Sequence, residues 1–387
     1  MPKFDDLSRS LVALDQDSTL IAVIELSHSS WLVGGMIPGV DREPLKKLAP
    51  DSEALLRLLY RWHDQGAARG HVSARICVAY EAGRDGFWLA RWLRARDIEC
   101  HVIHPTSVSV SREHRRAKSD RLDIGLLKRS FLGWLRGEKK HCSMAAVPTR
   151  EEEDGKRPLR ERERLVSEAT RLVNRMKGLL ALHGIAKFDV LAKTAPQQLR
   201  AVLTAEGELL PPNTLAELLR AHERLQQIQA QIDAIESAQR QRLRDNPEAG
   251  LHPMILLLAR VYGVGLGTAE LLVREALARP LRDRRAVARY AGATGAPDAS
   301  GSKRREQGLA KAGNARVRRA LIQLAWRFLR HQPDSALAKW FRQRTQDGRR
   351  TTRKTMIVAL ARKLLIALWE LVTTGLVPAG VRMHAAI

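Results

Sequence analysis

An alternation of β-rich and helical runs over residues 19–135 constrains the fold of this chain more than any other feature. Two β-rich runs, "TLIAVIELS" and "SWLVGGMIP", are joined by a short link, as in a hairpin. Helical and strand patterns then alternate, at 52–70 (helix), 74–83 (strand), 87–97 (helix), 99–105 (strand) and about 119–135 (helix). This order predicts a mixed sheet with helices on its faces, so we expect an α/β domain over residues 1–150.

The next stretch, residues 151–245, has the pattern of a long helical arm. The charged segment "TREEEDGKRP" lies at its start and is typical of a linker. Apolar residues then recur at alternating spacings of three and four from Leu165 to Leu179 and from Leu218 to Ile235, which is a heptad seam. "HGI" and "LLPPN" lie between the two series, so we expect an antiparallel pair of helices. Two uses of the seam are open: packing on the chain's own domain, or pairing subunits, which the length of the series favours.

Residues 246–387 are basic and mostly helical in pattern. "PMILLLARVYGVGLGTAELLVREA" predicts two apolar helices broken at Gly263-Val264-Gly265, which is the helix-hairpin-helix pattern. Glycines at such a break let the turn form and leave backbone N–H groups at a helix N-terminus, where they can hold a phosphate. An ordinary tight turn between two helices is the alternative, because such turns often contain glycine.

The charge balance selects the class of partner. Lys and Arg number 66 against 42 Asp and Glu, a net charge of +24, which favours a polyanion. We place nucleic acid ahead of a membrane surface and expect no membrane partner, because the most apolar stretches, 254–273 and 355–374, contain charged residues.

The N-terminus has no signal-peptide core. The three cysteines are too scattered for a disulfide framework, and the His and Cys spacings do not suit zinc, so we expect a cytoplasmic protein.

Four acidic residues of the α/β region are candidate metal ligands. Glu25 and Glu81 lie at the ends of predicted strands, and Asp120 and Asp123 share one face at the start of the following helix. Four carboxylates that converge there would repel one another unless cations lay between them. Mg²⁺ takes oxygen ligands and keeps substrate phosphate in its shell, and two such ions can activate a nucleophile and stabilise the leaving oxygen of a phosphodiester. A solvated surface charge is the alternative for each acid alone, least so for Glu81, which follows a buried strand.

A segment over residues 292–319 combines a candidate nucleophile with basic residues. Its glycine spacing and the order Ser302-Lys303 do not fit a nucleotide-binding P-loop. We expect a Gly/Ala/Ser loop followed by a basic helix. A serine in such a loop can attack phosphorus while neighbouring cations stabilise the developing charge, although a phosphate contact is the commoner role.

Basic residues and glycines of the C-terminal region are candidate contacts for a nucleic-acid backbone. A merely solvated basic face is the alternative for the run at 342–354. The candidates are Gly263, Gly265, Lys303, Arg304, Arg305, Lys311, Asn314, Arg316, Arg318, Arg319, Arg350, Arg353 and Lys354.

Segments along nearly the whole chain resemble a known family. They include "IAVIELSHSSWLV", "VAYEAGRDG", "AKSDRLDIGLL", "VYGVGLGTAELLV" and "SGSKRREQGLAKAGNARVRR", in this order. The ordered set is similar to the IS-one-ten and IS-eleven-eleven insertion-sequence transposases, which are also described as bridge-RNA-guided recombinases.

The resemblance implies a RuvC-like domain of the RNase H fold over 1–150, a coiled-coil arm over 151–245 and a C-terminal transposase domain with a catalytic serine over 246–387. It assigns the family's four acids, as catalytic residues and metal ligands, to Glu25, Glu81, Asp120 and Asp123. It assigns the serine to Ser300, with Ser302 as a minor competitor. Glu25 departs from the pattern, because the first acid is commonly Asp.

The resemblance also implies Mg²⁺, double-stranded DNA at the element ends and the target, a noncoding bridge RNA, and a homodimer that forms a tetramer as a dimer of dimers in the bacterial cytoplasm, at the nucleoid. Ser300 would attack a phosphate and form a phosphoserine intermediate, with the acid and serine domains coming from different subunits. Three alternatives stay open: a metal-dependent nuclease or junction resolvase, a site-specific invertase of the same family, and an inactive RNA- and DNA-binding protein.

Overall fold

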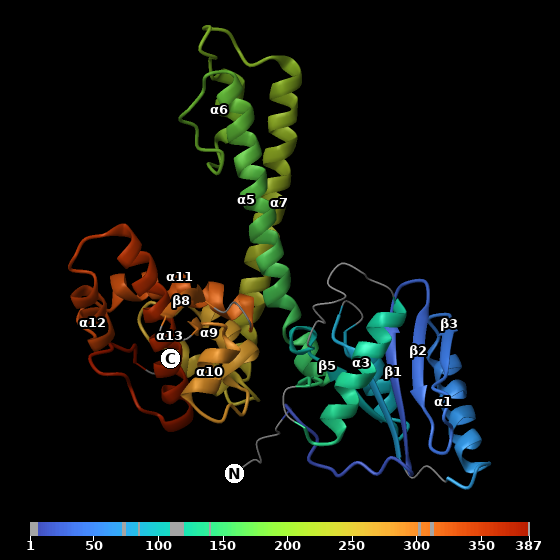
Figure 1. The fold of residues 1–387 in the computed structure, drawn as a ribbon. Coiled ribbons are helices and arrows are strands. Elements are labelled where there is room, and N and C mark those ends of the chain that lie inside the picture. Colours follow the sequence, from blue (N-terminus) through green and yellow to red (C-terminus); the bar gives the residue numbers. More distant parts are fainter. Residues whose placement is uncertain are drawn as a thin grey trace. The chain divides into compact units, whose positions relative to one another are not determined.

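The computed structural model describes residues 7–71, 75–83, 86–108, 120–138, 141–300, 303–309 and 313–385; the side chains at 120–121, 296–300 and 303–308 are not described. The chain divides into two compact units, Met1–Arg150 and Glu151–Ile387 (Figure 1). Each unit has hydrophobic clusters of its own.

Within its described residues, the N-terminal unit is built on a six-stranded mixed sheet of order β3-β2-β1-β4-β5-β6. The strands are β1 (Thr19–Leu26), β2 (Trp31–Met36), β3 (Leu45–Leu48), β4 (Arg75–Glu81), β5 (Glu99–Ile103) and β6 (Met144–Ala145). Strands β1, β4 and β5 are parallel, and the other pairings are antiparallel. The carboxyl ends of the three parallel strands therefore meet at one edge of the sheet, where α/β proteins often bind ligands.

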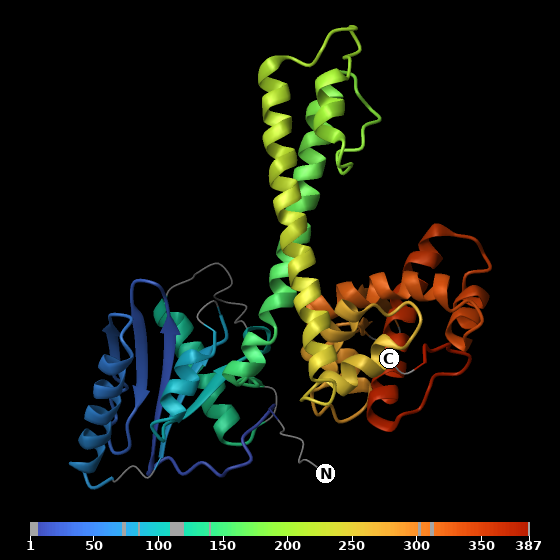
Figure 2. The same ribbon diagram turned by 180° about the vertical axis from the view of Figure 1, so that it is seen from behind.

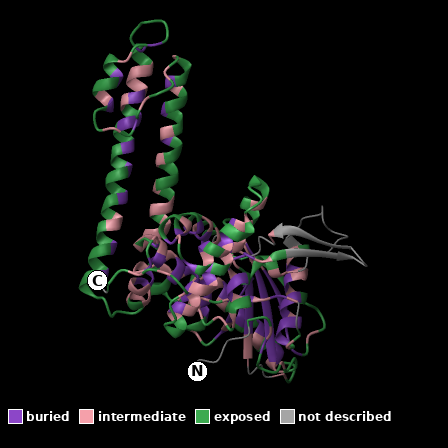
Figure 3. Ribbon diagram, turned by 90° about the vertical axis from the view of Figure 1, so that its left-hand side faces the viewer, coloured by how far each residue is buried: buried purple, intermediate pink, exposed green. Residues whose placement is uncertain are grey.

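Helices cover both faces of this sheet. They are α1 (Ser52–Ala67), α2 (Trp88–Arg94) and α3 (Asp120–Leu135), with a 3₁₀ turn, η1 (Pro105–Ser107), before α3. Successive side chains along each strand lie on opposite faces of the sheet. Ala22 and Val78 pack with α1 and α2 on one face, whereas Val23 and Ala79 pack with α3 on the other. Buried residues are concentrated in the central strands (Figure 3). The expected α/β architecture with a mixed sheet is confirmed.

Two strands of the sheet were not expected from the sequence. Strand β3 has the sequence "LKKL" and is mostly exposed at the sheet edge, and β6 has only two residues. Short, polar edge strands carry little hydrophobic pattern, because they bury little apolar surface.

The second unit begins with a pair of long helices. Its first elements are α4 (Arg150–Asp154), α5 (Arg157–Leu182), α6 (Ala195–Ala201) and α7 (Pro212–Asp245). Helices α5 and α7 lie side by side in opposite directions (Figure 2). The segment expected to be a linker contains the boundary between the two units, and most of it is helical: α4 is followed after Gly155 and Lys156 by α5. Three glutamates in the first turn of α4 and the proline at the start of α5 favour helix starts at these points.

The apolar residues of the two heptad series pack against each other within one chain. Met176 and Leu180 of α5 are buried in the same cluster as Leu218, Leu225 and Ile232 of α7. The expected antiparallel pair is therefore present. The expectation that these residues pair subunits is corrected, because their partner helix belongs to the same chain.

The remaining elements form a helical region with one short hairpin. They are α8 (His252–Ala259), α9 (Leu266–Leu272), a π-helical turn η2 (Val273–Leu277), α10 (Arg284–Tyr290), β7 (Gly295–Ser300), β8 (Lys303–Leu309), α11 (Ala315–His331), α12 (Ala336–Arg344) and α13 (Arg350–Thr374). Apolar residues of α13, from Ile357 to Leu371, pack with those of α8 to α12 in a single cluster. None of the helices in the described ranges has the length and apolar character needed to cross a membrane.

The loop expected around residue 300 is a β-hairpin instead. Strand β7 pairs antiparallel with β8, and Ser300, the last residue of β7, lies opposite Lys303. The segment has no β-branched residue in β7, so strand propensity gave no signal. Backbone pairing between the two segments forms the hairpin.

Candidate active site

The register of β1 and β4 brings two glutamates side by side. Ile24 lies opposite Tyr80 in this parallel pair, and the next residues are Glu25 and Glu81. Side chains alternate along a strand, so Glu25 continues the row of Val23 and Glu81 continues the row of Ala79. Both rows face α3. The two carboxylates are therefore presented at the strand ends toward that helix.

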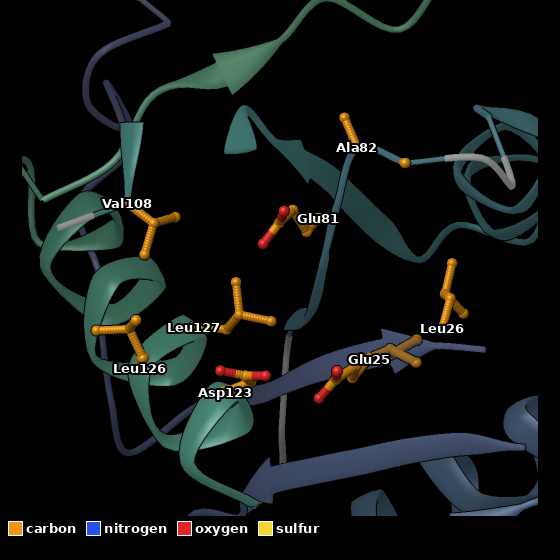
Figure 4. A pocket seen from close by; sticks show the side chains of 10 residues that line it. Glu25, Leu26, Glu81, Ala82, Val108, Asp123, Leu126 and Leu127 are labelled. Atoms are coloured by element: carbon orange, nitrogen blue, oxygen red, sulfur yellow. The ribbon is translucent and has the colours of Figure 1, made fainter. Parts of the chain in front are cut away.

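Helix α3 brings a third acid to the same place. Its residues Ile124 and Leu127 are buried against the sheet, and Asp123 lies one turn before Leu127 on the same side of the helix. Glu25, Glu81 and Asp123 line one pocket with a volume of about 380 Å³. Figure 4 shows the three carboxylates around the space between the strand ends and α3.

The lining of this pocket suits a cation. Besides the three acids it consists of apolar residues and Gly83, and the described lining contains no basic side chain, on a chain whose net charge is +24. Carboxylate oxygens are the ligands that Mg²⁺ takes, and that ion usually keeps water and substrate phosphate in its shell. Over the described residues, no three acidic, His or Cys side chains stand close enough together to form a complete metal site. Over the described residues, the pocket therefore gathers three oxygen-donor side chains without forming a metal site by itself.

The other predicted catalytic residues are seen only in part. Asp120 is the first residue of α3, three positions before Asp123, and its side chain is not described. Ser300 ends β7, and its side chain is likewise not described, nor are those of Lys303, Arg304 and Arg305 in β8. Ser302 and Lys311 lie outside the described residues.

Comparison with known proteins identifies the family. The sequence model of the protein family described as "Transposase IS116/IS110/IS902 family" matches residues 256–340 of the chain, from α8 to α12. A protein of Sinorhizobium fredii (strain NBRC 101917 / NGR234) named "Putative transposase y4rJ" is 41% identical over 371 residues, which cover 93% of each chain. The chain belongs to the IS116/IS110/IS902 family of transposases. The resemblance to IS-one-ten (IS110) transposases is confirmed, and the chain is a transposase.

The transposase has the predicted helix break at its two glycines. Helices α8 and α9 flank the segment, and Gly263 has a φ of +89°, which glycine adopts without strain. A Cβ at Gly263 would also approach the Cβ of His331 to 3.1 Å. Gly265 is the N-cap of α9 with an ordinary φ of −72° and open space around it. Only Gly263 is therefore required by the turn itself.

Several of the predicted nucleic-acid contacts in the transposase, Asn314 among them, have partners in its own second unit. The amide oxygen of Asn314 caps α11 by accepting from the backbone N–H groups of Arg316 and Val317. Its amide nitrogen donates to Glu275 at 3.0 Å. Sequence reasoning missed Glu275, which is buried in the π-helical turn. These bonds fix the start of α11.

Glu163 of α5 joins the arm of the transposase to α11. Sequence reasoning also missed this residue. Arg316 Nε donates to Glu163 Oε2 at 2.9 Å, and Arg319 Nη1 donates to Glu163 Oε1 at 2.6 Å. Arg318 is half-buried on the same helix. No local pattern signals Glu163, because its partners lie more than 150 positions along the chain.

The last three predicted contacts, Arg350, Arg353 and Lys354, are exposed on the first turns of α13. The guanidinium of Arg353 lies over the ring of Trp326, 5.4 Å from its centroid.

The thiols of the transposase are unsuited to nucleophilic attack. All three cysteines are buried. Burial raises the pKa of Cys100 to about 12, and it likewise raises the pKa of Cys142 to about 12. A thiol with such a pKa stays protonated near neutral pH, and the protonated form is a poor nucleophile.

Proposed function

We propose that this transposase moves an insertion sequence by cutting and rejoining DNA, guided by an RNA, with Ser300 as the nucleophile and Mg²⁺ held at the acid pocket. The observation that carries the proposal is the pocket where Glu25, Glu81 and Asp123 meet at the ends of β1 and β4 and the start of α3. A carboxylate-lined pocket of this kind suits phosphodiester chemistry, which family membership also requires of the chain.

Glu25, Glu81, Asp120 and Asp123 would hold the metal. When bound, Mg²⁺ supplies positive charge that polarises the scissile phosphate. Asp120 and Asp123 are separated by less than one helical turn, so one helix start contributes two carboxylates. Glu25 has one methylene more than the Asp common in the family and reaches about one C–C bond further.

The Oγ atom of Ser300 forms a bond to phosphorus while the P–O bond to one DNA strand end breaks. The serine proton leaves, and the released strand oxygen takes up a proton, so no oxidant or reductant is needed. A hydroxyl of the incoming strand then attacks the phosphoserine, restores Ser300 and completes the exchange. Lys303, Arg304 and Arg305 follow in β8 and supply positive charge beside the developing phosphate charge.

RNA guidance, assembly and domain roles follow the family resemblance. We assign residues 1–150 to a RuvC-like domain, 151–245 to the arm and 246–387 to the transposase domain. The mixed sheet covered on both faces supports the RuvC-like assignment. The net charge of +24 with only 5% aromatic residues supports a protein that binds mainly backbone phosphates and leaves sequence choice to base pairing. A tetramer, as a dimer of dimers acting on nucleoid DNA in the cytoplasm, completes the proposal.

Strand exchange by purified protein tests this proposal. The full chain is incubated with Mg²⁺, the RNA that copurifies with it, and DNA carrying the element ends and the target. We expect recombinant DNA from the wild type and from Ser302→Ala, but none from Ser300→Ala or without the RNA.

The alternatives give different results in the same experiment. Strand exchange or cleavage by Ser300→Ala would favour a metal-dependent nuclease or junction resolvase. A recombinant product restricted to one fixed chromosomal locus would favour an invertase. Absence of any product from all proteins, despite tight RNA and DNA binding, would favour an inactive binding protein.

A further inference from the structure

Helix α11 exposes a polar and aromatic face. Gln323, Trp326 and Arg330 follow one another at spacings of three and four and therefore share one side of the helix. All three are exposed, and 40% of the surface of Trp326 is accessible to solvent. Leu321 and Phe328, on the other side of the helix, are buried in the core. The helix thus keeps its smaller apolar residues inside while a large indole stays outside.

Neighbouring helices hold the indole and add positive charge. Phe341 of α12 meets Trp326 edge-on, with ring centroids 6.4 Å apart and planes at 75°. Arg353 of α13 places its guanidinium 5.4 Å from the centroid of the same ring. Arg350 and Lys354, both exposed, lie beside Arg353 on α13. The indole is therefore oriented by packing, with the guanidinium of Arg353 over its ring and further basic residues exposed on the same two helices.

We propose that this face, formed by Gln323, Trp326 and Arg330 of α11 with Arg350, Arg353 and Lys354 of α13, binds an unpaired segment of RNA. We call it the α11 face. A nucleobase stacks on the exposed part of the Trp326 ring while the arginines and the lysine contact the flanking phosphates. The amide of Gln323 can hydrogen-bond a base edge or a ribose 2′-hydroxyl.

The chemistry of the α11 face favours a single strand over a duplex. The faces of bases in a duplex are covered by their stacked neighbours, so an indole on the convex surface of a helix gains nothing from them. Phosphate contacts alone would not require an aromatic ring at this place. The choice of RNA rests on the proposed function, in which a guide RNA with unpaired loops is a constant partner.

Binding measurements in EDTA test the α11 face without any DNA chemistry. Full-length protein is titrated into a short fluorescent single-stranded RNA of mixed sequence, its DNA counterpart and a duplex DNA, and the Kd is read from fluorescence anisotropy. For Trp326→Leu we expect the RNA Kd to rise about tenfold, as for loss of one stacked base, and the duplex Kd to change less than about twofold. Trp326→Phe should keep most of the affinity. Trp88→Leu, at an indole that is 42% exposed in the other unit, should bind RNA like the wild type.

Several results would overturn the proposal. If the Trp326→Leu variant binds RNA as tightly as the wild type, no base stacks on Trp326. If Trp326→Leu loses as much affinity for single-stranded DNA as for RNA, the face is not specific for RNA. If it loses as much affinity for the duplex, the ring only supports the neighbouring charges. Should the circular dichroism of Trp326→Leu show misfolding, photo-cross-linking of wild-type protein to 4-thiouridine RNA decides: the adduct is expected on the peptide carrying Trp326, and adducts confined to other peptides contradict the proposal.

The same titration separates this proposal from the catalytic one. Ser300→Ala protein should bind the RNA with the wild-type Kd, because its altered side chain is not part of the α11 face. Failed strand exchange with intact RNA stacking would count against the catalytic proposal alone. Active strand exchange with no contribution of Trp326 to RNA binding would count against the α11 face alone.

Discussion

Ile24 of β1 and Tyr80 of β4 lie opposite each other in the parallel register, and a glutamate follows each of them. This pairing makes Glu25 and Glu81 neighbours at the edge of the sheet, on the side that packs against α3. The helix then adds Asp123. The acid pocket thus depends on one strand register and one helix–sheet contact, both fixed by buried apolar residues.

Removal of one charge from the pocket should reduce strand exchange strongly. For Glu81→Gln and Asp123→Asn we expect rates lower by about 100-fold or more, because a metal that stabilises phosphate charge contributes several kcal/mol. Glu138→Gln is the matched control, since this partly exposed acid just beyond α3 pairs with His141 instead. Recombinant product is quantified over a range of Mg²⁺ concentrations. Wild-type rates in both pocket variants would show that the acids have no catalytic role.

Substitution of Glu25 by Asp tests the departure from the family pattern. Both side chains present two carboxylate oxygens, so Glu25→Asp should stay within about tenfold of wild-type activity, and Glu25→Gln should lose about 100-fold. The Mg²⁺ concentration for half-maximal rate should differ between wild type and Glu25→Asp, because the carboxylate is displaced by one C–C bond. Equal activity of Glu25→Gln and wild type would exclude this residue as a ligand.

Glu163→Gln should release two arginines of α11. The carboxylate is 35% exposed and its partners more so, so we expect a loss of less than about 1 kcal/mol in the free energy of unfolding. Arg316 and Arg319 then become available to phosphates, so duplex DNA should bind more tightly, with a salt slope steeper by up to about two units. Glu168→Gln, on the same helix, is the control. Unchanged DNA affinity and salt slope would show that the released arginines do not reach DNA.

The pH dependence of stability should report the ion pairs of Glu99. Burial opposes the charged form of this carboxylate, but hydrogen bonds from His101 at 2.6 Å and from Arg75 at 2.6 and 2.7 Å outweigh it and hold its pKa well below the usual range. A lowered pKa in the folded state stabilises the fold above the ordinary glutamate pKa, and this contribution is lost as pH falls below that value.

Thermal unfolding of Glu99→Gln and wild type should therefore differ most near pH 7, where His101 and Arg75 lose their partner, and the difference should shrink progressively as pH falls below the ordinary glutamate pKa. Glu138→Gln provides the comparison for a more exposed pair. A difference between Glu99→Gln and wild type that stays constant over this range would refute the linkage.

The sequence predicts local parts of this architecture well. Glu25 and Glu81 are recognisable because each lies at the end of a buried strand, and Asp123 because helix spacing links it to Asp120. The heptad series predicts two helices but not their partner, since the same seam suits one chain or two. The β7–β8 hairpin has no strand propensity to signal it.

Contacts between distant positions are the part that local reasoning misses. Glu163 with Arg319, and Trp326 with Arg353, meet only after helices have packed. For neither residue of such a pair does the local sequence pattern predict the partner. The α11 face is therefore visible only in the folded chain.

A covalent DNA adduct tests the central claim most directly. Wild-type protein is trapped with labelled element DNA, its RNA and Mg²⁺, resolved on a denaturing gel and digested, and the modified residue is identified by mass spectrometry. We expect a phosphodiester on Ser300 that forms only with Mg²⁺ and is lost in Glu81→Gln. An adduct on another residue, or one that forms equally in EDTA, would contradict it.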